Sequence, residues 1–119
     1  MKTLELFAGS RSFSKVAEKM GHETYTTDHE AFEKIDQVCD IFDFDYDKVL
    51  DEYGKPDVVW ASPPCTFFSV GSIGKHWNKD HTPKSGQAIY GMEIVIFMNE
   101  LIRKFDPKYY FIENPRGKL

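Results

Sequence analysis

The stretch Val58-Val59-Trp60-Ala61-Ser62-Pro63-Pro64-Cys65-Thr66-Phe67-Phe68-Ser69 joins an apolar run to two prolines and a single thiol. The apolar run predicts a buried strand over residues 58–61. Each proline fixes its own φ and pushes the preceding residue toward extended conformations, so the chain leaves this strand rigidly and directs Cys65 outward. A thiol held in this way suits a nucleophile, because sulfur attacks well even when only a small fraction is thiolate. Taken alone, Cys65 has a second interpretation, a small buried residue after a strand.

A carboxylic acid ends a second strand-like run near the end of the sequence. Residues 109–112 are aromatic or β-branched, and Glu113-Asn114-Pro115-Arg116 follows them. In an open α/β sheet the carboxyl ends of parallel strands face one crevice, so we expect the Glu113 carboxyl and the Cys65 thiol in one pocket. This pairing favours a catalytic interpretation more than either residue does alone.

Three short motifs together resemble those of the DNA cytosine-C5 methyltransferase family. Pro64-Cys65 matches the nucleophile loop of that family, Glu113-Asn114 matches its acid motif, and Leu6-Phe7-Ala8-Gly9 matches its cofactor loop. The motifs occur in the family's order and reach from one end of the chain to the other. The resemblance implies S-adenosylmethionine as the cofactor, with Cys65 and Glu113 as catalytic residues.

The composition fits one globular domain. The chain has 119 residues, of which 41% are hydrophobic and 15% aromatic, and its apolar runs are too short to span a bilayer. The N-terminus has no apolar signal core, and Cys39 and Cys65 do not make a disulfide framework, so we expect a cytoplasmic location and no membrane partner. The net charge of −4 argues against bulk attraction to nucleic acid but is compatible with a local basic patch.

No metal site is predicted. The acidic run over residues 43–52 lacks the central glycine and the final bidentate glutamate of a calcium loop. His76 and His81 stand among lysines without a cysteine cluster, which does not make a zinc site.

Strand, helix and strand alternate along the sequence. Strands are expected at residues 2–7, 23–27, 38–41, 58–61 and 109–112, and helices at 12–20, 31–34 (a short segment), 45–53 and 85–105. Asp45 is expected to cap the helix that follows it, and Gly21 and Gly54 to end the helices before them. The alternation predicts an α/β fold with a parallel sheet in the order 3-2-1-4-5 and right-handed crossovers. The resemblance implies that this is the Rossmann-like fold of S-adenosylmethionine-dependent methyltransferases.

The turn after the first strand is expected to hold part of the cofactor. A strand that turns through a glycine into a helix N-terminus offers backbone N–H groups to an anion or a polar ligand edge. The resemblance assigns Phe7, Ala8, Gly9 and Ser10 to this loop. Gly9 alone is equally compatible with a tight turn. Arg11 stands where the family carries further glycines, so its side chain would either crowd the cofactor or contact its carboxylate.

Acidic residues follow the second and third strands. Asp28 is placed to accept hydrogen bonds from two ribose hydroxyls, although outside this fold it would be interpreted as a solvated loop acid. The resemblance implies the ribose role for Asp28 and implies that His29 covers the adenine. It also implies that Asp40 accepts a hydrogen bond from the adenine amino group and that Ile41 packs on the ring. Pro64 completes the residues assigned to the cofactor.

Residues 69–87 show no periodicity and combine glycines with lysines, histidines and a tryptophan. A polar loop of this length in a compact domain is commonly functional. We expect a mobile lid whose basic side chains contact phosphates and whose tryptophan stacks near a base, with an ordinary exposed loop as the alternative. The residues expected to contact nucleic acid are Ser69, Lys75, Trp77, Lys79, Asn114 and Arg116.

The resemblance implies a covalent mechanism on double-stranded DNA. Carbon 5 of cytosine is a weak nucleophile, and attack by the Cys65 thiolate at carbon 6 converts the ring into an enamine that takes the methyl group at carbon 5. A protonated Glu113 at ring nitrogen 3 offsets the developing charge. The target base has to leave the stack to reach Cys65. RNA stays open as a substrate, and neither the target sequence nor the oligomeric state follows from the residues.

The family continues past its acid motif with further strands and a target-recognition region, whereas this sequence stops at Leu119. We therefore expect residues 1–119 to form one partial catalytic domain, phage-like or truncated, without the C-terminal strands and the target-recognition domain. Such a chain would bind cofactor but methylate poorly or not at all by itself.

Two other interpretations stay open. Ser62-Pro63-Pro64 resembles the motif of amino-methyltransferases that act on adenine N6 or cytosine N4. A non-catalytic cofactor-binding remnant would keep the site without turnover.

Overall fold

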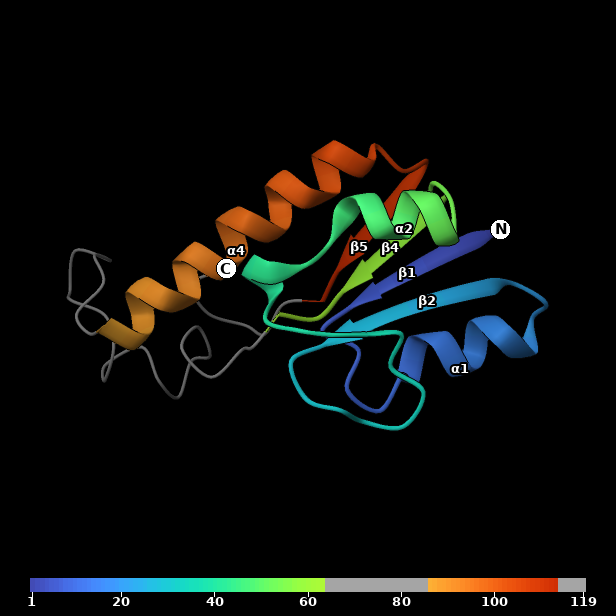
Figure 1. The fold of residues 1–119 in the computed structure, drawn as a ribbon, viewed down its shortest axis with the longest axis horizontal. Helices are drawn as coiled ribbons and strands as arrows, with labels where there is room; N and C mark the ends of the chain where they lie inside the picture. Colours follow the sequence, from blue (N-terminus) through green and yellow to red (C-terminus); the bar gives the residue numbers. More distant parts are fainter. Residues whose placement is uncertain (64–85, 114–119) are drawn as a thin grey trace.

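A parallel sheet forms the centre of the fold in the computed structural model, which describes residues 1–63 and 86–113. Its strands are β1 (Lys2–Leu6), β2 (Glu23–Asp28), β3 (Gln37–Val38), β4 (Val58–Ala61) and β5 (Tyr109–Ile112). Their order across the sheet is β3-β2-β1-β4-β5, and every neighbouring pair is parallel. The predicted α/β fold and the predicted strand order are confirmed (Figure 1).

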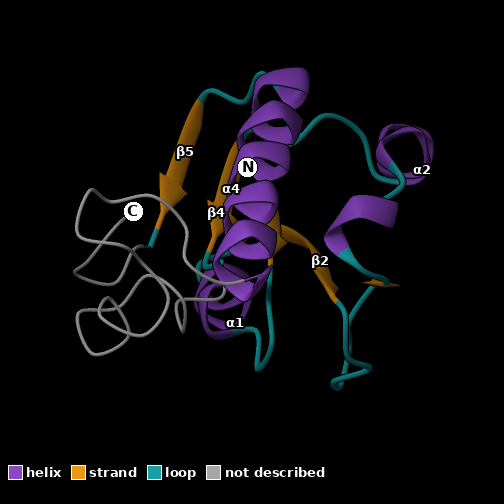
Figure 2. Cartoon of the chain, turned by 90° about the vertical axis from the view of Figure 1, so that its left-hand side faces the viewer, coloured by secondary structure: helices purple, strands orange, loops and turns teal. Residues whose placement is uncertain are grey.

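Helices cover both faces of the sheet. On one face α1 (Ser12–Lys19) packs against β1 and β2. On the opposite face lie α2 (Tyr46–Glu52) and the long α4 (Gly86–Phe105), with a short 3-10 helix, η1 (Ile41–Asp43), beside α4 (Figures 1 and 2). The fold therefore has three layers, and the loops after β1, β2 and β3 emerge at one edge of the sheet.

The hydrophobic core lies between the sheet and α4. Side chains alternate along a strand, so Leu4 and Leu6 of β1 are fully buried under α4, whereas Thr3 and Glu5 lie on the face that α1 covers. The other core residues, from β2, β4, η1, α2, α4 and the chain after η1, are Tyr25, Val59, Ala61, Ile41, Phe44, Val49, Ile94, Met98, Leu101, Ile102 and Phe105. This packing fixes α4 against the strand ends that carry the candidate site.

The helix boundaries follow the capping signals. The Asp45 carboxylate accepts a hydrogen bond from the Lys48 N–H at 3.0 Å and caps α2, as predicted. Gly21 and Gly54, with φ of 87° and 105°, follow α1 and α2, which confirms both expected helix ends. Each of these glycines adopts a conformation that a residue with a Cβ adopts only at a cost.

Two predicted elements are wrong. Residues 31–34 form a turn instead of a helical segment, and Lys34 has a left-handed φ of 61° that does not continue a helix. The third strand covers Gln37–Val38 instead of residues 38–41. Asp40 is the reason for the shorter strand, because its side chain accepts a hydrogen bond from the Phe42 N–H at 3.1 Å and so starts η1.

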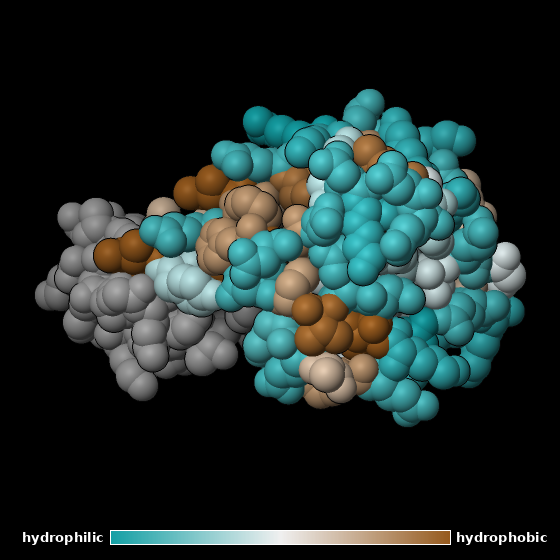
Figure 3. All heavy atoms as spheres, in the orientation of Figure 1, coloured by the Kyte–Doolittle hydropathy of each residue, from teal (hydrophilic) through white to brown (hydrophobic). Residues whose placement is uncertain are grey.

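Apolar side chains are exposed on both faces of the molecule. On the α1 side, Trp60 stacks on Phe13 with ring centroids 4.9 Å apart and also contacts Phe111, which is half exposed. Figure 3 shows further apolar surface over α4, a helix whose exposed residues include Met92 and Ile96. Within the described ranges, every helix is too short or too polar to cross a membrane.

Candidate active site

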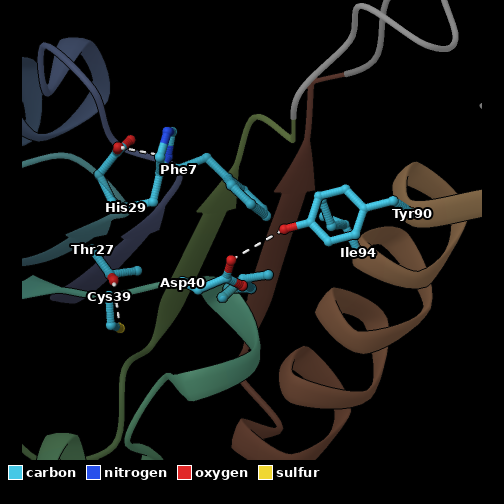
Figure 4. A pocket seen from close by; sticks show the side chains of 9 residues that line it. Phe7, Thr27, His29, Cys39, Asp40, Tyr90 and Ile94 are labelled. Carbon is cyan, nitrogen blue, oxygen red and sulfur yellow. Dashed lines mark hydrogen bonds and ion pairs between the residues drawn. The ribbon is translucent and has the colours of Figure 1, made fainter. Parts of the chain in front are cut away.

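A cavity of about 290 Å³ opens at the carboxyl ends of β1, β2 and β3 (Figure 4). The residues that line it are Phe7, Thr27, Asp28, His29, Cys39, Asp40, Ile41, Tyr90 and Ile94. The family resemblance implies cofactor binding for five of these residues, namely Phe7, Asp28, His29, Asp40 and Ile41. The fold therefore brings these five residues, from three separate segments of the chain, to one cavity.

Phe7 follows directly after β1 and has an uncommon backbone conformation. Its φ is 57°, in the left-handed region that residues with a Cβ rarely adopt. The next residue fixes this turn, because the Ala8 N–H donates to the Thr27 carbonyl at 2.9 Å. The side chain of Phe7 thereby lies in the cavity wall (Figure 4). Backbone strain of this kind is often found at binding sites.

Asp28 joins the turn after β1 to the turn after β2. Its Oδ2 accepts a hydrogen bond from the Gly9 N–H at 2.9 Å, and its Oδ1 accepts one from the Glu30 N–H at 3.0 Å. The carboxylate is almost buried, and the Nδ1 atom of the more exposed His29 lies 3.2 Å from Oδ1. Because each carboxylate oxygen has two acceptor positions, Asp28 keeps acceptor capacity for a ligand.

Asp40 occupies the opposite wall of the cavity from Phe7 (Figure 4). Its Oδ1 accepts the Phe42 N–H at 3.1 Å, and its Oδ2 accepts a hydrogen bond from the Tyr90 hydroxyl, also at 3.1 Å. The adjacent Ile41 is buried in the core and also lines the cavity. The Asp40 carboxylate, a hydrogen-bond acceptor, and the apolar side chain of Ile41 therefore lie side by side along the cavity.

Sequence reasoning missed four residues of the cavity wall. Thr27 and Cys39 flank the predicted acids, and burial raises the pKa of the Cys39 thiol. Tyr90 and Ile94 come from α4, one helical turn apart. That spacing is also the spacing of a core-facing helix stripe, so no local signal separates a cavity residue from a core residue there.

The remaining residues of the predicted cofactor loop lie elsewhere. Gly9 and Ser10 line a second cavity on the α1 side, together with Arg11, and the buried Ala8 lines neither cavity. Arg11 has a φ of 62°, and its guanidinium forms an ion pair with Glu18 on α1, which lowers the pKa of that carboxyl. The Arg11 side chain therefore turns along α1 and does not crowd or face the first cavity.

The predicted acid meets the start of the nucleophile loop at the ends of β4 and β5. The Glu113 N–H donates to the Ala61 carbonyl at 2.9 Å, and the Ser62 hydroxyl donates to Glu113 Oε2 at 3.0 Å. Ser62 in turn accepts a hydrogen bond from the Trp60 indole N–H at 3.2 Å. Because Ser62 directly precedes Pro63, the acid lies next to the chain that leads to the predicted nucleophile.

The other predicted site residues lie outside the described residues. They are Pro64, Cys65, Ser69, Lys75, Trp77, Lys79, Asn114 and Arg116, together with residues 69–85 of the expected lid. Among residues 1–63 and 86–113, no three His, Cys, Asp or Glu side chains are grouped as metal ligands would be.

Comparison with known proteins gives one informative similarity. No protein-family model matches the chain. The chain is 34% identical over 122 residues to a probable DNA (cytosine-5)-methyltransferase of Frog virus 3 (isolate Goorha), and the alignment covers 97% of this chain and 54% of the relative. The chain thus spans about half the length of this curated relative. Similarity along nearly the whole chain confirms the resemblance that the motifs indicated.

Proposed function

From this similarity to a DNA cytosine-5 methyltransferase, we propose that the chain binds S-adenosylmethionine and carries the residues for methyl transfer to carbon 5 of cytosine in DNA. The observation that supports the proposal most is the cavity at the ends of β1, β2 and β3. Its walls combine Phe7, Asp28, His29, Asp40 and Ile41, which come from three separate segments. In open α/β sheets, ligands bind at this position beside the point where the strand order reverses.

The residues of the cavity fit the adenosine half of the cofactor. Asp28 offers carboxylate acceptors to ribose hydroxyls, and Asp40 offers one to an exocyclic amino group. Phe7 and Ile41 supply apolar surface for a purine ring, and the exposed His29 can cover it. A volume of about 290 Å³ is close to that of a small-molecule site. The cofactor, when bound, supplies an electrophilic methyl group.

Cys65 and Glu113 are the proposed catalytic pair. The Cys65 thiolate forms a bond to carbon 6 of the cytosine while the Glu113 carboxyl gives its proton to ring nitrogen 3. Carbon 5 then takes the methyl group. Loss of the carbon-5 proton expels the thiolate, and return of the nitrogen-3 proton to Glu113 restores the aromatic ring. The position of Glu113 beside Ser62, three residues before Cys65, supports this pairing.

Contacts with DNA are proposed for residues outside the described ranges. Lys75, Lys79 and Arg116 would bind phosphates, Trp77 would stack near the flipped base, and Ser69 and Asn114 would contact the target strand. A salt titration of DNA binding tests the phosphate contacts, because each one lost reduces the dependence of affinity on salt.

Covalent trapping tests the proposed chemistry without requiring turnover. A DNA duplex that contains 5-fluorocytosine is incubated with the chain and S-adenosylmethionine. The fluorine that replaces the carbon-5 hydrogen cannot be removed as a cation, so the thiolate is not expelled. We therefore expect a denaturant-resistant adduct that peptide mapping places on Cys65. Cys65→Ser removes the adduct, whereas the matched Cys39→Ser keeps it.

Three other outcomes distinguish the alternatives. Methylation of an exocyclic amine that survives Cys65→Ser would support an amino-methyltransferase. Cofactor binding by calorimetry without any adduct would support a non-catalytic remnant. A chain that neither binds S-adenosylmethionine nor forms the adduct would overturn the proposal. The same trapping experiment with RNA in place of DNA shows which of the two nucleic acids is the substrate.

A further inference from the structure

Tyr90 extends from α4 into the wall of the candidate cofactor cavity and meets Asp40 there (Figure 4). Its hydroxyl donates to Asp40 Oδ2 at 3.1 Å, and its ring lies 5.8 Å from the ring of Phe42 in a tilted arrangement. The same Asp40 carboxylate accepts the Phe42 N–H through Oδ1 at 3.1 Å. Two donors from different elements therefore hold the two oxygens of one carboxylate, which restricts its rotation.

We propose that Tyr90 is a specificity-determining residue, which holds the Asp40 carboxylate so that the cavity selects a purine with an amino group over one with a keto group. The inference rests on the proposed cofactor site. A carboxylate only accepts hydrogen bonds, so it pairs with the N–H of an amino group and repels a carbonyl oxygen. This discrimination requires that the carboxylate stays in place. It also requires that no neighbouring group donates a hydrogen bond to the keto oxygen instead.

The Tyr90 hydroxyl holds the carboxylate in place and does not itself donate to a keto group. By donating to Oδ2 it leaves the second acceptor position of that oxygen for the ligand, and its own proton is already committed to Asp40. Burial and the bond to Asp40 both raise the pKa of the Tyr90 phenol, so the hydroxyl remains a donor at neutral pH. Without this bond, the Phe42 N–H is the one remaining donor to Asp40 within the described residues, and the released oxygen is free to turn away from an incoming base.

The ring of Tyr90 has a separate role from its hydroxyl. It packs with Phe42, which in turn contacts Phe97 edge-on at 5.3 Å, and this cluster holds η1 against α4. Tyr90→Phe keeps the ring and removes only the hydroxyl. Tyr46→Phe is a matched control, because the Tyr46 hydroxyl donates to the Lys104 carbonyl at the other end of α4, away from the cavity.

Calorimetry with two ligands tests the inference. The full chain is titrated with S-adenosylhomocysteine and with S-inosylhomocysteine, which carries a keto group in place of the amino group. We expect the wild type to prefer the adenosyl ligand by at least about tenfold, and Tyr90→Phe to reduce this preference by about fivefold, which is the loss of roughly one hydrogen bond. Tyr46→Phe should leave the preference unchanged.

The thermal unfolding midpoint is measured for all three proteins. A structural role alone would lower the midpoint in Tyr90→Phe and weaken both ligands equally, whereas the inference requires a loss of affinity that is selective for the adenosyl ligand, whether or not the midpoint falls. Binding of both ligands with the same preference in Tyr90→Phe as in the wild type would overturn the inference and leave the proposed function intact. Binding of neither ligand by the wild type would overturn the proposed cofactor site, and the inference with it.

Discussion

Ser62 and Glu113 lie 51 positions apart in the sequence and meet where β4 and β5 end, with the Ser62 hydroxyl donating to Glu113 Oε2 at 3.0 Å. The direction of this hydrogen bond is set by Trp60, whose indole nitrogen donates to Ser62 Oγ at 3.2 Å. An indole N–H has no acceptor capacity, so the serine accepts from Trp60 and its own proton is free for the acid. A defined chain of donors thus ends on the residue that we propose as the catalytic acid.

We expect Ser62→Ala to slow formation of the Cys65 adduct with 5-fluorocytosine DNA by about three- to tenfold, the effect of roughly one hydrogen bond. Glu113 is exposed, and in the described part of the chain Ser62 is the side chain that holds its carboxylate. The adduct rate is measured by denaturing gel under single-turnover conditions. Trp60→Phe removes the indole donor to Ser62 and should slow adduct formation less than Ser62→Ala does. An unchanged rate in Ser62→Ala would show that this hydrogen bond does not position the acid.

Cys39 should report on the candidate cofactor cavity, which it lines. Burial raises the pKa of its thiol above the ordinary value of 9.0, and only the thiolate is alkylated. In Cys65→Ser protein, Cys39 is the remaining thiol of the two. We expect its alkylation by iodoacetamide at pH 8 to be about tenfold slower than in the urea-unfolded chain. The folded-state rate should still rise at pH values where the unfolded-state rate has levelled off.

Mass spectrometry of the labelled peptide gives the rate for each state. Added S-adenosylhomocysteine should slow the alkylation of Cys39 further, because the ligand would occupy the same cavity. Identical pH profiles for the folded and unfolded chains would contradict the assigned burial of the thiol. An unchanged rate with saturating ligand would place the ligand elsewhere.

The sheet could be predicted because its strands carry their own patterns. Leu4 and Leu6 alternate with polar residues in β1, and the apolar run of β4 ends at two prolines. The third strand could not be placed in this way. It consists of Gln37 and Val38, and its end depends on a side-chain hydrogen bond of Asp40 that no periodicity reveals.

The candidate site could be predicted where its residues follow strands. Asp28 lies at a strand end and Asp40 soon after one, so the topology alone brings them to one edge. Tyr90 could not be found, because it comes from a helix whose path over the sheet depends on tertiary packing. The direction of the Arg11 side chain depends on Glu18, seven residues later along α1, and the family motif carries no information about that partner.

Tyr53 ties α2 to the first strand and should contribute measurably to stability. Its hydroxyl donates to the Thr3 carbonyl at 2.9 Å and accepts the Thr3 N–H at 3.0 Å. We expect Tyr53→Phe to lower the free energy of unfolding by about 1–2 kcal/mol in urea denaturation near pH 7. Tyr109→Phe, which alters an exposed tyrosine, should cost less than about 0.5 kcal/mol.

The contribution of Tyr53 should depend on pH above the neutral range. Burial raises the pKa of the folded-state phenol above its ordinary value of 10.0. The contribution is therefore fully present below pH 10 and is lost as the pH rises toward the folded-state pKa, because the unfolded chain releases its proton first. The wild type should lose stability above pH 10 more steeply than Tyr53→Phe does. Parallel pH profiles for the two proteins would argue against this burial.

Glu5 should stabilise α1 from the strand below it. Its carboxylate is buried and accepts the Ser14 N–H at 3.0 Å, in the first turn of α1. The helix has no acidic residue in that turn, and Arg11 at its N-cap makes no side-chain cap. A carboxylate bound to an N-terminal N–H replaces such a cap and also interacts favourably with the helix dipole.

We expect Glu5→Ala to lower the free energy of unfolding by about 2 kcal/mol, because the Ser14 N–H is then left without its buried acceptor. Glu5→Gln keeps an acceptor oxygen and should cost about half as much. Glu23→Ala, which removes an exposed glutamate at the start of the neighbouring strand, is the matched control and should cost less than about 0.5 kcal/mol. Because α1 follows directly on the turn through Gly9 that Asp28 holds, Glu5→Ala should also weaken binding of S-adenosylhomocysteine. A loss of stability in Glu5→Ala no larger than in Glu23→Ala would show that the buried carboxylate does not cap the helix.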